Sequence, residues 1–144
     1  TGYSQIGKPT GGGIRDRFIG MLSYRSKALT LAGEYARTKD RMDAPPDPAV
    51  APNATTIDGQ VLSVFGVFHI PASRAAIIGR VDVTDPNTDV DDNQQTRFIA
   101  GASYQLTPAL RLLADVDNLA FEGTPTPVQY ATKTQAFFQA QYAF

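Results

Sequence analysis

The chain has 144 residues, of which 42% are hydrophobic and 19% charged, with a formal net charge of -1. It contains no cysteine, which excludes disulfides, thiolate nucleophiles and cysteine-ligated metals. No apolar run reaches the roughly 18 residues that a membrane helix needs, and the balanced charge gives no nucleic-acid footprint.

Seven segments alternate apolar and polar residues with a period of two, which is typical of strands with one apolar and one wet face. In chain order they are residues 16–25, 28–38, 60–70, 75–84, 96–106, 110–119 and 132–144. The sequence therefore predicts an all-β protein of seven antiparallel strands. One surface is expected to carry Leu31, Val64, Ile77, Leu112 and Phe138, and the opposite one Arg80, Arg97, Arg111 and Gln139.

The last segment, residues 132–144 (TKTQAFFQAQYAF), alternates most strictly. One parity is small or apolar from Thr134 to Phe144, and the other is rich in glutamine. A strand of about ten residues with one apolar and one wet face is what a transmembrane β-barrel requires. The segment therefore predicts a membrane strand.

The connectors sort by length in the way that outer-membrane barrels do, with short periplasmic turns and longer extracellular loops. The short connectors are residues 26–27, 71–74 and 107–109. The long ones, predicted to be extracellular, are residues 39–59, 85–95 and 120–131. Residues 1–144 are therefore expected to belong to one β-barrel domain in the outer membrane of a Gram-negative bacterium.

Aromatic residues fall near both expected ends of the strands, as in the interfacial girdles of membrane barrels. Tyr24, Tyr104 and Tyr142 precede the predicted periplasmic edge. The outer girdle is expected to contain Phe18, Tyr35, Phe98 and Phe121.

Seven strands is an odd number, whereas bacterial single-chain barrels have even counts. Residues 1–13 (TGYSQIGKPTGGG) are glycine-rich and unpatterned, and they are predicted to be a loop remnant. The chain is therefore expected to be the C-terminal part of a larger barrel, with the remaining N-terminal strands as its partner. An alternative, a small closed barrel with residues 3–8 as an eighth strand, stays open.

A family resemblance agrees with this interpretation. Residues 79–87 (GRVDVTDPN), 98–119 (FIAGASYQLTPALRLLADVDNL) and 139–144 (QAQYAF) resemble the C-terminal strands of bacterial porins, particularly the phosphate-selective porin O/P-like group. The resemblance implies about 16 to 18 strands, often a trimer, and passive diffusion of small hydrophilic or anionic solutes. It also implies that Tyr142 and Phe144 form the signal read by the outer-membrane assembly machinery.

The charged residues of the wet parity are the best candidates for function, because side chains on that face would line a lumen. The pore-lining candidates are Arg17, Arg25, Glu34, Arg80, Asp82, Arg97, Arg111, Asp115, Asp117 and Lys133. Two interpretations remain open. Arginine and aspartate side chains could pair across neighbouring strands in a neutral wall, or Arg17, Arg80, Arg97 and Arg111 could form an anion path.

Catalysis and metal binding find little support in the sequence. The single histidine, His69, has no carboxylate beside it, so no catalytic residue and no cofactor are predicted. Asp85, Asn87, Asp89 and Asp91 alternate like the first oxygens of a calcium loop, but the sixth-position glycine and the closing glutamate are missing. They are weak candidates for divalent ions beside lipopolysaccharide.

The sequence thus predicts a porin-like, non-enzymatic channel for small hydrophilic solutes or ions, with a modest anion preference. Its expected partners are outer-membrane lipid and lipopolysaccharide, and no nucleic acid. Two alternatives belong to other classes: a structural β-barrel anchor or sleeve of a larger outer-membrane complex, and a soluble all-β binding module.

Overall fold

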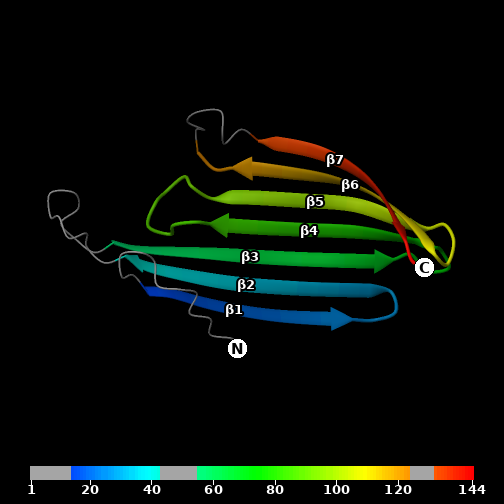
Figure 1. The fold of residues 1–144 in the computed structure, drawn as a ribbon, viewed down its shortest axis with the longest axis horizontal. Helices are drawn as coiled ribbons and strands as arrows, with labels where there is room; N and C mark the ends of the chain where they lie inside the picture. The colour runs from blue at the N-terminus through cyan, green and yellow to red at the C-terminus, as the bar shows by residue number, and fades with distance from the viewer. Residues whose placement is uncertain (1–13, 43–54, 124–131) are drawn as a thin grey trace.

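The computed structural model describes residues 14–42, 55–123 and 132–144, which form one seven-stranded antiparallel sheet. Each strand pairs with its neighbours in sequence, so the strands lie side by side in chain order (Figure 1). The strands are β1 Ile14–Arg25, β2 Leu29–Met42, β3 Thr55–His69, β4 Ala75–Asp85, β5 Gln95–Gln105, β6 Leu110–Phe121 and β7 Lys133–Tyr142. The predicted all-β class and the seven antiparallel strands are confirmed.

The three short turns and the C-terminus lie at one end of the sheet, which we call the turn end (Figure 1). The opposite end is the loop end. At the first turn, the backbone N–H of Ser26 donates to the carbonyl of Leu29 at 2.7 Å, and the Ser26 hydroxyl accepts from the Leu29 N–H at 3.0 Å. Thr107 caps the third turn by accepting from the Leu110 N–H at 3.0 Å. Small hydroxyl side chains favour such reversals because they satisfy backbone groups locally.

The predicted strand boundaries differ most from the structure around the loop of residues 39–59. β2 continues to Met42 and β3 begins at Thr55, so residues 39–42 and 55–59, predicted as loop, pair in the sheet. Lys39 faces Asp58 across this extension. Most residues there are charged or carry a hydroxyl, so hydrophobic periodicity gave no strand signal, although opposite charges on neighbouring strands also stabilise sheets. The prolines at positions 45, 46, 48 and 52 lie outside the described residues.

The sheet is not closed into a barrel, and β1 and β7 form its two edges. Residues 1–13, which include the segment considered as an eighth strand, lie outside the described residues. Within the described part, the loops predicted at residues 85–95 and 120–131 also lose their first residues to β4 and β6.

Cross-strand register divides the sheet into two faces. Leu31, Val64, Ile77, Leu112 and Phe138 share the surface that we call the apolar face. Arg80, Arg97, Arg111 and Gln139 share the other surface, the charged face. The predicted division of side chains between the two faces is confirmed, because pairing without bulges preserves the period of two along every strand.

The described residues hold almost no apolar core. Ala76, at 5% exposure, is the only buried hydrophobic residue among them. Large apolar side chains of the apolar face are open instead, including Leu22 at 82% and Phe138 at 73% exposure. An isolated sheet with both faces uncovered cannot bury enough apolar surface to offset its conformational entropy. Among the described residues, the apolar face has no covering layer.

Candidate functional site: the charged concave face

All ten predicted pore-lining residues share the charged face. One row of register partners crosses the sheet from β2 to β7 through its middle: Glu34, Ser63, Asp82, Arg97, Leu119 and Lys133. The neighbouring row toward the turn end contains Phe65, Arg80, Ile99, Asp117 and Gln135. Together these rows form a belt that contains charges of both signs.

The charged face is concave over this belt. A hollow of about 470 Å³ is lined by residues from six strands, from Glu34 on β2 to Lys133 on β7. A flat sheet would keep these two strands about 24 Å apart. A single hollow that touches both strands is what a sheet curved toward its charged face produces.

Arg97 and Asp117 make the strongest contact in the hollow, between β5 and β6. The Arg97 Nε donates to both carboxylate oxygens of Asp117, at 2.9 and 3.1 Å, and Nη2 donates to Oδ2 as well. Asp117 is 9% exposed. This bidentate geometry fixes both side chains against the wall and cancels their charges locally.

Arg80 and Asp82 form a second pair, two residues apart on β4. The Arg80 Nε donates to each Asp82 oxygen at 2.9 Å. The hydroxyl of Ser63, on β3, also donates to Asp82. Ser63 is buried and holds the carboxylate in place. The sequence indicated the face on which Ser63 lies but not this role, because the partner of a hydroxyl depends on register.

The four arginines that could form an anion path differ in their ion-pair partners. Arg17 forms an ion pair with Asp40 of β2, and Arg80 and Arg97 are paired as described. Arg111 donates instead to the neutral side-chain oxygen of Gln105, at 3.0 Å. The sequence did not predict Asp40 as a partner of Arg17, because Asp40 lies beyond the predicted end of its strand.

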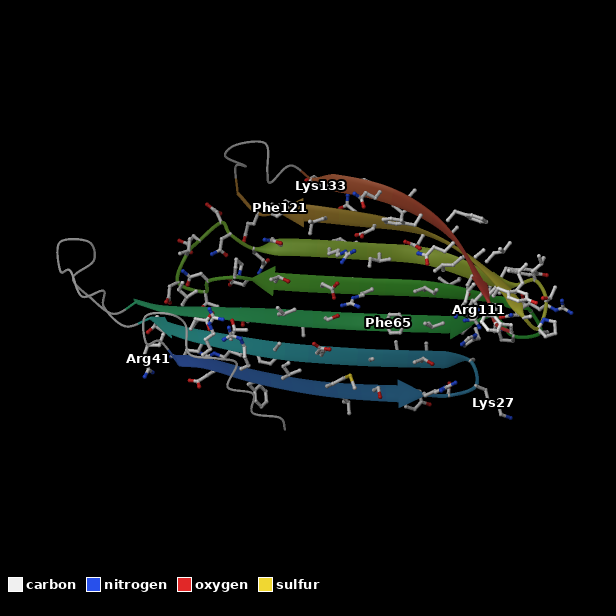
Figure 2. All side chains as sticks on the ribbon, in the orientation of Figure 1. Lys27, Arg41, Phe65, Arg111, Phe121 and Lys133 are labelled. Atoms are coloured by element: carbon white, nitrogen blue, oxygen red, sulfur yellow. The ribbon has the colours of Figure 1, made fainter. Side chains whose placement is uncertain are left out.

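Arg111 also lies far from the belt. The register partner of Arg97 on β6 is Leu119, eight residues from Arg111 along the strand, or about 26 Å. Figure 2 shows Arg111 at the turn end and Lys133 at the loop end. Near Arg111, a second hollow of about 470 Å³ is lined mainly by Ile78, Ser103, Leu113, Gln139 and Gln141.

The remaining candidates take different places on the same face. Arg25 lies at the turn end of β1, and Asp115 faces Gly101 across β5 and β6. Glu34 and Lys133 mark the two sides of the central hollow. Among the described residues, no ion pair involves either of these two side chains.

The weak metal candidates cap their own loop. The Asp85 carboxylate accepts from the Asn87 N–H at 3.1 Å, and the Asn87 side-chain oxygen accepts from the Asp89 N–H at 3.2 Å. In the part of the chain that the structure describes, no three histidine, cysteine or carboxylate side chains gather as a metal site would need. His69 lies at the turn end of β3 and is exposed.

Aromatic residues on the apolar face follow oblique lines. The row of register partners through Tyr24 reaches Ala100 on β5 and Ala136 on β7. Tyr104 lies four residues past Ala100 toward the turn end, and Tyr142 lies six past Ala136. Since β5 is four strands and β7 six strands from β1, the tyrosine line shifts by one residue per strand.

This shift determines the angle between the tyrosine line and the strands. With about 3.3 Å per residue and about 4.8 Å between strands, a line through the tyrosines is inclined by about 35° to the perpendicular of the strands. Phe18 and Phe98 each lie six residues toward the loop end from Tyr24 and Tyr104. They define a second line parallel to the first.

Tyr35 belongs to the apolar face near this second line, as expected. Phe121 does not. Its register partner is Gln95, which places it on the charged face and corrects its assignment to the outer girdle. The assignment was wrong because β6 continues beyond its predicted end at residue 119. The alternation of side chains along β6 then places Phe121 on the charged face.

No family model, no curated protein and no solved structure matches this chain. Within the described residues, no helix is long and apolar enough to cross a membrane.

Proposed function

We propose that this chain forms part of the wall of an outer-membrane β-barrel channel for passive diffusion of small hydrophilic solutes or ions. The observation that carries the proposal is the pair of oblique aromatic lines on the apolar face. If both lines lie parallel to a membrane, the strands tilt by about 35° from its normal, and barrel strands tilt by about 35–45°.

The apolar surface between the lines has suitable dimensions. On β4 the apolar face stays free of charge over the segment of nine residues from Ala75 to Val83. At this tilt they span about 22 Å of membrane thickness, close to the apolar band of about 25 Å on barrel proteins. Lipid would supply the cover that the described residues lack.

The concave charged face supports a water-filled lumen. A barrel encloses its concave side, and the central hollow carries charged and amide groups on that side. A soluble module would have to cover the apolar face with a second layer, and an oblique aromatic line would serve no purpose there.

The selectivity expected from the charged face is a small anion preference. Three of the four arginines considered as an anion path form ion pairs with carboxylates. Paired charges largely cancel in the field along a pore. Arg111, whose described partner is neutral, contributes positive charge that no described ion pair cancels.

A planar-bilayer recording of the full-length protein tests the proposal. We expect stable, ohmic openings and a reversal potential that favours anions slightly. Changing Arg80, Arg97 and Arg111 together to Ser should shift that potential toward cations, because Asp82 and Asp117 lose their partners. Absence of conductance from correctly folded protein would instead support the second candidate, a structural anchor or sleeve, which the same apolar face allows.

A further inference from the structure

We propose that Arg37, Lys39 and Arg41 of β2, which we call the basic patch, bind the phosphate groups of an anionic lipid whose acyl chains lie on the apolar face. This inference rests on the membrane location in the proposed function. It adds the class of the ligand, which is a phosphate-bearing amphiphile. It also adds the membrane leaflet in which that ligand lies.

The basic patch begins where the apolar surface ends. Arg37 is the register partner of Phe18, which belongs to the aromatic line at the loop end. Lys39 and Arg41 occupy the next two positions of the same face. Figure 2 shows Arg41 at the loop end of β2, at the opposite end of the sheet from Lys27. Apolar surface, aromatic line and cations therefore follow one another toward the loop end of β1 and β2.

The described carboxylates do not neutralise the basic patch. Asp58 on β3 lies 3.3 Å from Lys39 and 3.7 Å from Arg37, and its side chain is 16% exposed. Asp16 on β1 is the register partner of Lys39. On the two strands next to β2, two carboxylates thus face three cations, and no ion pair among the described residues involves Arg41. The Arg37 side chain is 60% exposed, so its guanidinium can still reach a ligand.

A hollow of about 240 Å³ beside the patch provides room for a headgroup. It is lined by Asp16, Arg17, Phe18, Arg37 and Lys39. Phe18 provides its apolar side, and three cations with the single carboxylate of Asp16 provide its charged side. A ligand that satisfies both needs an apolar chain joined to an anionic head, which a free anion, a nucleic acid or an acidic peptide lacks.

The turn end offers no such site on the apolar face. The outermost residues there are Tyr24, Leu29, Phe68, Ala75, Tyr104, Leu110 and Tyr142, none of them charged at neutral pH. The asymmetry assigns the phosphate contacts to the leaflet at the loop end. Guanidinium groups suit this ligand because their planar donors match phosphate oxygens.

The test is native mass spectrometry of the full-length protein released from micelles that contain phosphatidic acid and phosphatidylcholine. We expect the parent protein to retain phosphatidic acid selectively. Changing the basic patch to Arg37→Gln, Lys39→Gln and Arg41→Gln should lower retention by at least about tenfold. Arg41→Gln alone should cause a smaller loss without touching the contacts of Asp58. The matched control, Lys27→Gln with Arg74→Gln at the turn end, should retain lipid as the parent does.

Three results would overturn the inference. Unchanged retention in the triple variant would remove the basic patch as the binding site, and equal loss in the turn-end control would show a nonspecific charge effect. Full displacement of phosphatidic acid by millimolar inorganic phosphate would identify a free-phosphate site instead. Bilayer conductance, recorded on the same preparations, reports separately on the pore, because the patch lies on the face opposite the lumen.

Discussion

The two faces of this sheet are built from alternate residues of the same strands, yet the middle of one face is apolar and the middle of the other is charged. Phe137 and Phe138 are adjacent on β7, but Phe138 belongs to the apolar face and Phe137 to the charged face. The apolar face carries exposed aliphatic and aromatic side chains with no described partner layer. The charged face is concave, and three of its arginines form ion pairs with carboxylates. The comparison teaches that the proposed channel would set the apolar face against lipid and the charged face against water.

The largest expected difference comes from placing one charge on each face. Phe138→Arg should lower the free energy of unfolding in lipid by about 2–4 kcal/mol, because the cation would enter hydrocarbon near the middle of the apolar band. Phe137→Arg removes the same ring from the neighbouring position but points toward water, so we expect a clearly smaller loss. Urea unfolding in vesicles measures both. Equal losses would contradict the assignment of the faces.

Two glycines give the next largest contrast. A Cβ at Gly101 would lie 2.6 Å from the Asp115 Cβ and 2.7 Å from the Ala114 carbonyl oxygen, so β5 and β6 would have to separate. Gly101→Ala should cost about 1–3 kcal/mol of stability. Gly79→Ala is the control, because nothing lies within 4 Å of its Cβ position. It should be neutral or slightly stabilising, since alanine restricts the unfolded chain.

Reversal of this order, with Gly79→Ala the more damaging of the two, would show that the packing between β5 and β6 differs from the one described. The same unfolding assay in vesicles measures both glycine variants.

The smallest effect should come from the ion pair in the hollow. Arg97→Ser leaves Asp117 without its described partner and should move the reversal potential toward cations, with little change in conductance. The double variant Arg97→Ser and Asp117→Ser removes one charge of each sign and should return the potential toward that of the parent. A shift in the double variant as large as in the single one would show that the pair lies outside the ion path.

Much of the sheet could be predicted from local pattern. The period of two assigned Leu31, Val64 and Phe138 to one face and Arg80 and Arg97 to the other, because side-chain alternation is a property of the extended backbone itself. The turns at Ser26 and Thr107 were recognisable from residues that bond to nearby backbone groups. Prediction failed where alternation was carried by charges, as at Lys39 and Asp58.

The site was predictable as a set of residues but not as an arrangement. Parity grouped Arg97, Asp117 and Arg111 on one face, whereas the register shows that Arg97 and Asp117 pair and that Arg111 lies about 26 Å away along the strand. The assembly signal at Tyr142 and Phe144 stays a prediction. In the structure Tyr142 ends β7 and Phe144 is fully exposed.

By itself, the sequence determined which side chains share a face, where the short turns fall and that no cysteine chemistry is possible. The tertiary structure alone decided the offset between neighbouring strands. That offset sets the oblique line from Tyr24 to Tyr142, the partner of every arginine and the curvature of the charged face. The physical reason is that alternation depends on one strand, whereas register, tilt and ion pairing depend on how two strands, distant in the chain, are aligned.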